Sequence, residues 1–128
     1  MPERLRPLLQ AMVPPQVRLE IDMPPLPPQS PACEDTIVRI CQEAVSNALR
    51  HASPSCIRVS LALDPLCLRL AVSDDGRGIA TRAPRGMGLD NMRQRLHALG
   101  GSLQIRRRRP RGTSIVAQLP RQDLEPER

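Results

Sequence analysis

The sequence predicts an α/β domain in which helices cover one face of a sheet. Two observations carry this prediction. Apolar residues recur at helical spacing from about Glu34 until Ser53, and in the next two segments, 56–63 and 66–73, they alternate with polar residues as in strands. This alternation gives the predicted hairpin one apolar face, which begins at Leu66 in the second strand and which we expect to pack on helices.

Three shorter segments precede the long helix. Residues 4–13 carry apolar side chains at helical spacing, and Pro14-Pro15 ends that helix. Residues 17–22 alternate as in a half-buried strand, and Pro24 to Pro31 is typical of an extended linker.

The elements after the hairpin follow from the same signals. Residues 74–88 are rich in Gly, Asp and Arg and predict a mobile loop. A helix is expected over 89–99, because apolar residues recur there at helical spacing and two glycines follow. Two final strands are expected over 102–106 and 113–119, and the polar tail after them is expected to fray.

Composition limits the possible functions. The 128 residues are enough for one core, which must be aliphatic because Phe, Tyr and Trp are absent. Their absence also excludes aromatic platforms for stacking bases. All 19 cationic residues are arginine, and the net charge of +6 suits a polyanionic nucleotide as well as nucleic acid.

The four cysteines form no C-x-x-C pair and have no histidine partner at zinc spacing, so we expect reduced thiols. No apolar run approaches the roughly 20 residues that span a bilayer, and the N-terminus lacks the apolar region of a signal peptide. The sequence therefore predicts a soluble, cytoplasmic piece without membrane contact.

The polar face of the long helix carries Arg39, Glu43, Asn47 and Arg50, which align because they are three or four residues apart. Asn47 offers an uncharged oxygen to Mg²⁺, and Glu43 is placed to orient or deprotonate a metal-bound water. Arg50 and His51 end the helix within reach of phosphates, although a histidine there is also a common dipole partner. The alternative is that this face is simply solvated.

Asp74-Asp75-Gly76-Arg77-Gly78-Ile79 directly follows a predicted strand. At the end of that strand, the Asp74 carboxylate can accept a hydrogen bond from the amino group of adenine. Gly76 and Gly78 let the backbone approach the base, and Ile79 supplies an apolar wall. An ordinary Asp-Gly turn is the alternative.

A second glycine pair, Gly86 and Gly88, lies where the loop becomes a helix. The free amides and the positive dipole end of residues 89–91 suit phosphate oxygens. A flexible glycine loop would give the same pattern.

Four consecutive arginines, at 106–109, fit a nucleic-acid binder, since phosphate contacts give salt-sensitive binding. We favour a solvated strand end, with Pro110 and Gly112 turning the chain. Thr113 follows and is placed to reach the pocket from the last strand, whereas His97 is expected on an exposed face without a role.

These motifs together resemble a known family. Residues 39–52 are similar to the N box, and residues 86–101 to the second glycine box, of the ATP-binding catalytic domain of sensor histidine kinases, in the nitrate/nitrite-sensor and degradation-sensor branch. The resemblance runs from about Val17 to Pro120. It extends to the larger group with gyrase, the ninety-kilodalton heat-shock chaperones and mismatch-repair ATPases.

The resemblance implies a two-layer α/β sandwich, with a mixed, mostly antiparallel sheet covered on one face by helices (the Bergerat fold). It implies ATP with Mg²⁺, with Glu43 as the catalytic residue and Asn47 as the metal ligand. The nucleotide-binding residues it implies are Asn47, Arg50, His51, Asp74, Gly76, Gly78, Ile79, Gly86, Met87, Gly88, Leu89 and Thr113.

The resemblance also implies partners. Residues 1–15 would be a helical stub from a dimerisation segment, 16–120 the catalytic domain and 121–128 a frayed tail. No phosphoacceptor hairpin is expected within this chain, so the γ-phosphoryl group would pass to a histidine on helices outside it and then to a response regulator. A stand-alone regulatory module, such as an anti-sigma serine kinase, is the alternative; direct nucleic-acid binding is not expected.

Overall fold

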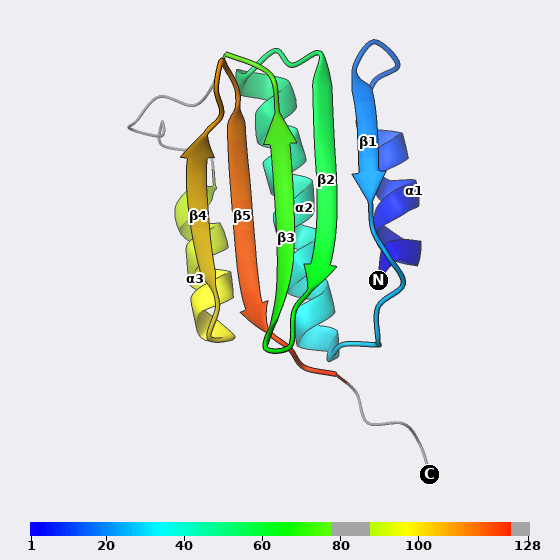
Figure 1. Cartoon of the computed structure of the whole chain (residues 1–128), viewed down its shortest axis with the longest axis vertical. Coiled ribbons are helices and arrows are strands. Elements are labelled where there is room, and N and C mark those ends of the chain that lie inside the picture. The colour runs from blue at the N-terminus through cyan, green and yellow to red at the C-terminus, as the bar shows by residue number, and fades with distance from the viewer. Residues whose placement is uncertain (78–87, 124–128) are drawn as a thin grey trace.

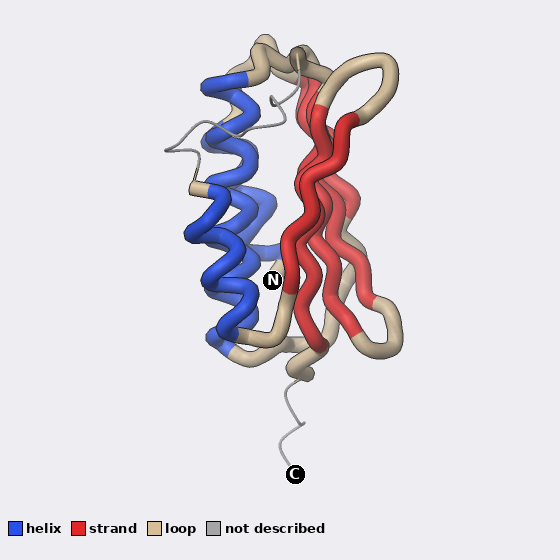
Figure 2. The backbone as a smooth tube through the Cα atoms, turned by 90° about the vertical axis from the view of Figure 1, so that its left-hand side faces the viewer, coloured by secondary structure: helices blue, strands red, loops and turns tan. Residues whose placement is uncertain are grey.

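The computed structural model describes residues 1–77 and 88–123. These residues form two layers, a five-stranded sheet and a layer of helices on one of its faces (Figures 1 and 2). Because the second face of the sheet carries none of the described helices, the strands alternate between buried apolar and more exposed polar side chains. The predicted arrangement of a sheet with helices on one face is confirmed.

The elements follow the predicted order. Their bounds are α1 Pro2–Met12, β1 Arg18–Asp22, α2 Pro31–His51, β2 Cys56–Leu63, β3 Cys67–Asp74, α3 Leu89–Ala98, β4 Ser102–Arg107 and β5 Thr113–Pro120. The sheet has the order β1-β2-β3-β5-β4. β1 pairs with β2 in parallel and every other pairing is antiparallel, so the sheet is mixed and mostly antiparallel as expected.

α2 begins three residues before the predicted start at Glu34. The Ser30 side chain caps the helix by accepting a hydrogen bond from the Cys33 backbone N–H, and Pro31 occupies the first turn. A serine cap followed by proline is a favourable helix start, because proline lacks the N–H that would stay unpaired there. The predicted linker therefore ends one residue earlier, at Ser30.

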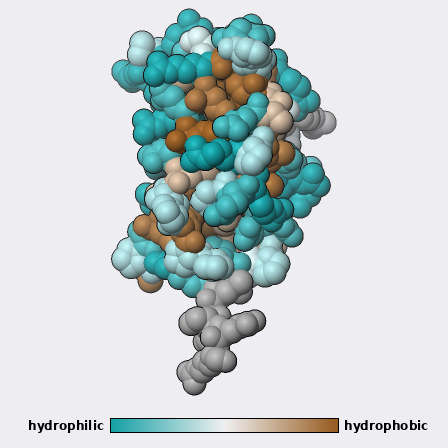
Figure 3. All heavy atoms as spheres, turned by 90° about the vertical axis from the view of Figure 1, so that its right-hand side faces the viewer, coloured by the Kyte–Doolittle hydropathy of each residue, from teal (hydrophilic) through white to brown (hydrophobic). Residues whose placement is uncertain are grey.

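The core lies between α2 and the sheet and is aliphatic. Its fully buried large side chains come from the three helices and the inward rows of the strands, and include Leu5, Leu9, Ile37, Ile40, Ile57, Leu61, Leu68, Leu70, Met92, Leu96 and Leu119. Figure 3 views the edge formed by α1 and β1, where apolar patches lie among polar side chains. Part of the apolar surface of α1 and β1 is thus only half-buried.

Leu66 is an exception to the predicted apolar row. Its side chain is 78% exposed, because β3 begins only at Cys67 and Leu66 lies in the turn before it. The Asp64 carboxylate closes that turn by accepting hydrogen bonds from the backbone N–H groups of Leu66 and Cys67. Local turn chemistry overrides the alternating pattern at this position.

The segment before α2 is tied to the chain after β5. The buried Gln29 side chain accepts a hydrogen bond from the Gln122 backbone N–H and donates one to the Asp123 carboxylate. The Ser30 hydroxyl also bonds to the Gln122 side chain. Residues 121–123, at the start of the predicted tail, are therefore held to the domain. Within the described ranges, no helix has the length and apolar character needed to cross a membrane.

Candidate nucleotide site

A polar cavity of about 510 Å³ opens on the side of α2 that faces away from the sheet. Three helices line it: α1 contributes Met12, α3 begins at its wall, and α2 supplies most of the lining. The lining residues are Met12, Arg39, Gln42, Glu43, Ser46, Asn47, Arg50, Gly88 and Asn91. The predicted polar face of α2 therefore lines this pocket together with residues of α1 and α3.

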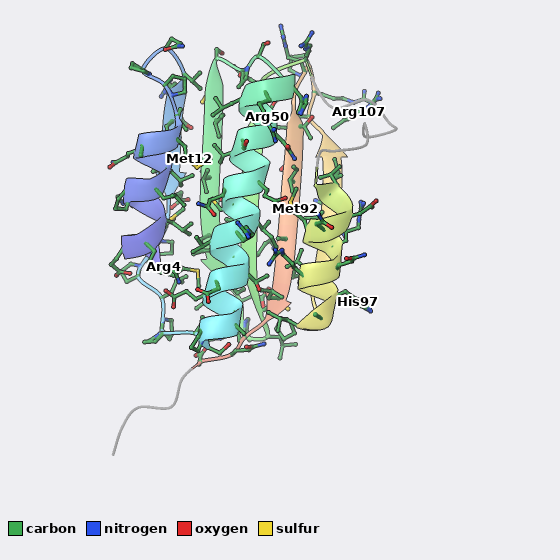
Figure 4. The ribbon with its side chains drawn as sticks, turned by 180° about the vertical axis from the view of Figure 1, so that it is seen from behind. Arg4, Met12, Arg50, Met92, His97 and Arg107 are labelled. Carbon is green, nitrogen blue, oxygen red and sulfur yellow. The ribbon has the colours of Figure 1, made fainter. Side chains whose placement is uncertain are left out.

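α2 places Glu43, Asn47 and Arg50 along one side of this cavity, as their spacing predicted. The Asn47 side chain is only 2% exposed, whereas Glu43 is half-buried and Arg50 is exposed. Arg50 projects from the C-terminal part of α2 (Figure 4), and its Nη2 donates a hydrogen bond of 3.3 Å to Asn47 Oδ1. A guanidinium group and an amide oxygen thus lie side by side, a combination suited to phosphate and to a hard cation.

The start of α3 forms the opposite wall of the cavity. Gly88 has a φ of +73°, and its carbonyl accepts the hydrogen bond from Met92 N that begins the helix. Leu89 is the first residue of α3 and packs into the core. The unpaired amides at a helix start favour anions, so this wall is chemically fit for phosphate oxygens.

Asp74 ends β3 and is only 5% exposed. Its Oδ1 accepts a hydrogen bond of 2.8 Å from the Gly76 backbone N–H. The residue pairs in the sheet with Thr113, whose side chain is also buried and whose backbone N–H helps to satisfy the carboxylate. Burial raises the pKa of Asp74 above its usual value, while the bonds from Gly76 and Thr113 act in the opposite direction.

The turn after Asp74 is fastened to the C-terminal end of α2. A Cβ atom on Gly76 would overlap the Ala52 carbonyl group, so this approach requires glycine. The Arg77 backbone N–H donates to the Ala52 carbonyl oxygen over 2.9 Å, and Arg77 Nε donates to the His51 carbonyl oxygen over 3.2 Å. The helix with Asn47 and the strand end with Asp74 are thereby held in a fixed relation.

The Asp75 carboxylate, unlike that of Asp74, bonds to the start of β2. It accepts hydrogen bonds from the Ser55 hydroxyl and from the backbone N–H groups of Ser55 and Cys56. These bonds, with the Ser55 hydroxyl first, lower the pKa of Asp75. The carboxylate thus anchors the start of β2 to the end of β3.

Apart from Leu89, which packs into the core, the predicted site residues divide into four sets. Glu43, Asn47, Arg50 and Gly88 line the cavity, whereas Asp74, Gly76 and Thr113 lie together around the end of β3. The His51 side chain is exposed and is not among the residues that line the cavity. The predicted residues Gly78, Ile79, Gly86 and Met87 lie outside the described residues.

Several cavity residues were missed by the sequence interpretation. Met12 lies on α1, which was expected to be a stub, and Gln42 and Ser46 were given no role. Only the backbone amide of Asn91, and not its side chain, was expected to take part. Asn91 belongs to the second glycine box, which was a usable signal, whereas no local signal connects Met12 to the site. His97 is exposed and points away from α2 (Figure 4), as predicted.

The donor set is compatible with Mg²⁺ held mainly by a nucleotide. In the described part of the chain, no group of three His, Cys, Asp or Glu side chains is placed to bind a metal. The buried Asn47 amide and the Glu43 carboxylate lie one helical turn apart in the same cavity, and both can offer an oxygen atom to a cation. This suits Mg²⁺, which takes one or two protein ligands and otherwise keeps water and phosphate oxygens.

Comparison with known families gives a match over residues 32–123 to the family described as histidine kinase-, DNA gyrase B- and HSP90-like ATPase. The chain is 36% identical over 103 residues to the nitrate/nitrite sensor protein NarX of Escherichia coli K12. The matched region is 78% of this chain and 17% of NarX. It is 34% identical over 93 residues to the sensor histidine kinase LiaS of Bacillus subtilis, and this match covers 71% of this chain and 26% of LiaS. The chain thus spans about a fifth of these relatives.

Solved structures agree on the fold. A blue-light activated histidine kinase from Erythrobacter litoralis superposes with a TM-score of 0.76 at 22% identity. The superposition covers 92% of this chain and 43% of the other. The two-layer arrangement of a mixed sheet and helices is therefore the same in both.

Proposed function

Because this chain belongs to the family of histidine kinase-, DNA gyrase B- and HSP90-like ATPases, we propose that it is the Mg-ATP-binding catalytic domain of a sensor histidine kinase. In this proposal the γ-phosphoryl group of ATP passes to a histidine on dimerisation helices that lie outside this chain. Residues 1–15 would connect to those helices and residues 16–120 would form the catalytic domain.

One observation carries the proposal. A polar cavity brings Glu43, Asn47 and Arg50 of α2 against the start of α3, and the turn after the buried Asp74 is fastened to the C-terminal end of α2. A ligand with an amino group at one end and a metal-bearing polyphosphate at the other would use both sets of residues. ATP has this chemistry.

Each set of residues has a proposed role in binding. At the adenine end, the Asp74 carboxylate accepts from the amino group, and the Gly76 backbone and Thr113 complete the base site. At the phosphate end, Asn47 contributes an oxygen to Mg²⁺, and Gly88 with Leu89 presents backbone amides. Arg50 and His51 would contact phosphates. Gly78 and Ile79 would complete the base site, and Gly86 and Met87 would bind phosphate together with Gly88.

Catalysis in this proposal depends on positioning and charge. Bound Mg²⁺ would neutralise part of the charge that phosphate oxygens gain during transfer. Glu43 is within the cavity and accepts a proton from the attacking group or from a water at the γ-phosphate. Arg50, held beside Asn47, stabilises negative charge on the transferred group, and its bond to Asn47 keeps both side chains in place.

We also propose that the domain acts in the cytoplasm, where it serves a two-component phosphorelay with a response regulator. A stand-alone serine kinase is not favoured, because the relatives named above are a nitrate/nitrite sensor and a sensor histidine kinase. Binding to nucleic acid is not favoured either, since two arginines of the β4–β5 connection bond to the protein backbone.

Two measurements test the proposal. Titration of the chain with ATP, with and without Mg²⁺, is expected to show binding that Mg²⁺ strengthens. Addition of a phosphoacceptor hairpin from a sensor histidine kinase is expected to give acid-labile phosphate on that hairpin. Absence of ATP binding would refute the nucleotide site, and acid-stable phosphate would point to transfer to serine.

A further inference from the structure

The β4–β5 connection lies against the turn that carries Asp74. Arg108 Nη1 donates a hydrogen bond of 3.2 Å to the Asp74 backbone carbonyl, and Arg111 Nε donates one of 3.3 Å to the Gly76 carbonyl. The two arginines therefore hold the turn at both ends. The sequence alone indicated a solvated strand end here. Both arginines are exposed, as that prediction requires, but each also bonds to a backbone carbonyl group.

The backbone of the connection also packs on this turn. A Cβ atom on Gly112 would overlap the Asp74 carbonyl oxygen, so the two backbones are in direct contact. The Arg108 backbone N–H donates a hydrogen bond of 3.0 Å to the Gly112 carbonyl oxygen. This bond closes the β4–β5 connection and fixes the backbone position from which the Arg108 side chain extends. The geometry of the turn and that of the connection are consequently coupled.

We infer that Arg108 and Arg111 are positioning residues for base recognition, which hold the backbone from Asp74 to Gly76 so that the Asp74 carboxylate faces adenine. The inference rests on the proposed function. Its physical basis is one shared turn. The Gly76 N–H in this turn orients the Asp74 carboxylate, and the two arginines hold the carbonyl groups of Asp74 and Gly76 in the same turn. The arginines act through the turn, and the Asp74 side chain makes the contact.

A competing role for these cations is direct attraction of the phosphates. The two roles differ in what they do to ATP and GTP, which share a triphosphate and differ in the base. Loss of phosphate attraction weakens both nucleotides equally. Loss of positioning weakens binding of ATP, whose amino group needs a well-placed carboxylate. It leaves binding of GTP, which has a carbonyl oxygen where adenine has that amino group, nearly unchanged.

The test uses Arg108→Gln, Arg111→Gln and the double variant, with affinities for ATP and GTP measured by titration. Hydrogen bonds to charged donors at an exposed site have modest net value, so we expect the ATP-to-GTP preference to fall about threefold for each variant and about tenfold for both. Arg109→Gln is the matched control. It removes the same charge from the same connection, and its side chain makes no hydrogen bond within the described residues.

Arg108→Lys keeps the positive charge and an ammonium group that can donate to the Asp74 carbonyl, so this variant is expected to retain most of the preference. Melting temperatures are expected to stay within a few degrees of the unchanged chain, because both arginines are exposed. An unchanged ATP-to-GTP preference in the double variant overturns the inference, as does an equal loss in Arg109→Gln. If the unchanged chain itself fails to bind ATP, the proposed function fails instead.

Discussion

Gly88 lies against the carboxylate of Glu43. Its φ of +73° is in the left-handed region, and a Cβ atom there would overlap Glu43 Oε2. Gly88 precedes α3 and Glu43 lies in the middle of α2, so this contact brings the start of one helix to the side chain that we propose for proton transfer. The start of α3 and the Glu43 carboxylate therefore meet where two walls of the cavity come together.

Gly88→Ala is expected to slow phosphoryl transfer more than it weakens ATP binding, because the new methyl group displaces Glu43. The backbone cost should be about 1 kcal/mol of unfolding free energy. Transfer rates to an added acceptor hairpin, measured with saturating ATP, check this. Gly100→Ala is the control, since its φ of +77° carries the same backbone cost and its nearest neighbour would be Pro120 at 3.5 Å. Equal rates in the two variants would contradict the contact's importance.

Asn47→Ala is expected to remove the strengthening of ATP binding by Mg²⁺. The buried amide is the metal ligand that we propose, and its loss also frees Arg50 from a hydrogen bond. ATP titrations with and without Mg²⁺ measure the effect, and the unfolding free energy should fall by about 1 kcal/mol. Thr36→Ala, on the same helix and outside the cavity lining, should leave the Mg²⁺ effect intact. Persistence of the full effect in Asn47→Ala would exclude this ligand.

Asp74→Asn and Asp75→Asn are expected to have opposite consequences. The first replaces the carboxylate that we propose as acceptor of the adenine amino group, so ATP affinity should fall by at least tenfold while the unfolding free energy changes little. The second weakens the bonds to Ser55 and Cys56, so stability should fall by about 1 kcal/mol with a smaller change in affinity. Calorimetry of binding and of unfolding on both variants checks the pair. A reversed pattern would exchange the roles of the two carboxylates.

Asp75 should make the fold sensitive to acid. Its pKa in the folded chain lies below the ordinary value of 3.8, so its contribution to stability is complete above that pH and is lost as the pH falls through the lowered pKa. The raised pKa of the buried Asp74 acts in the opposite sense, since its protonation on acidification relieves the cost of burial. Unfolding free energies at about pH 6 and about pH 3 should differ less in Asp75→Asn than in the unchanged chain. An identical difference would show that Asp75 does not carry this sensitivity.

Most helices and strands were predictable because their signals are local. The period of the apolar residues located α2, β2 and β5, and the aligned polar face of α2 identified Glu43, Asn47 and Arg50 as one group. The start of α2 was placed late although Ser30 and Pro31 were visible signals. Leu66 was placed wrongly, because alternation cannot indicate where a turn ends and a strand begins.

By itself the sequence determined the family, the order of the elements and the residue types that nucleotide binding needs. Only the tertiary structure decided the parallel pairing of β1 with β2, the division of labour between Asp74 and Asp75, and the contact of Arg108 with Asp74, 34 residues away. The reason is physical: periodicity reports which face of an element is buried, whereas hydrogen bonds to backbone carbonyls depend on which strands become neighbours. That choice is made by the packing of the whole sheet.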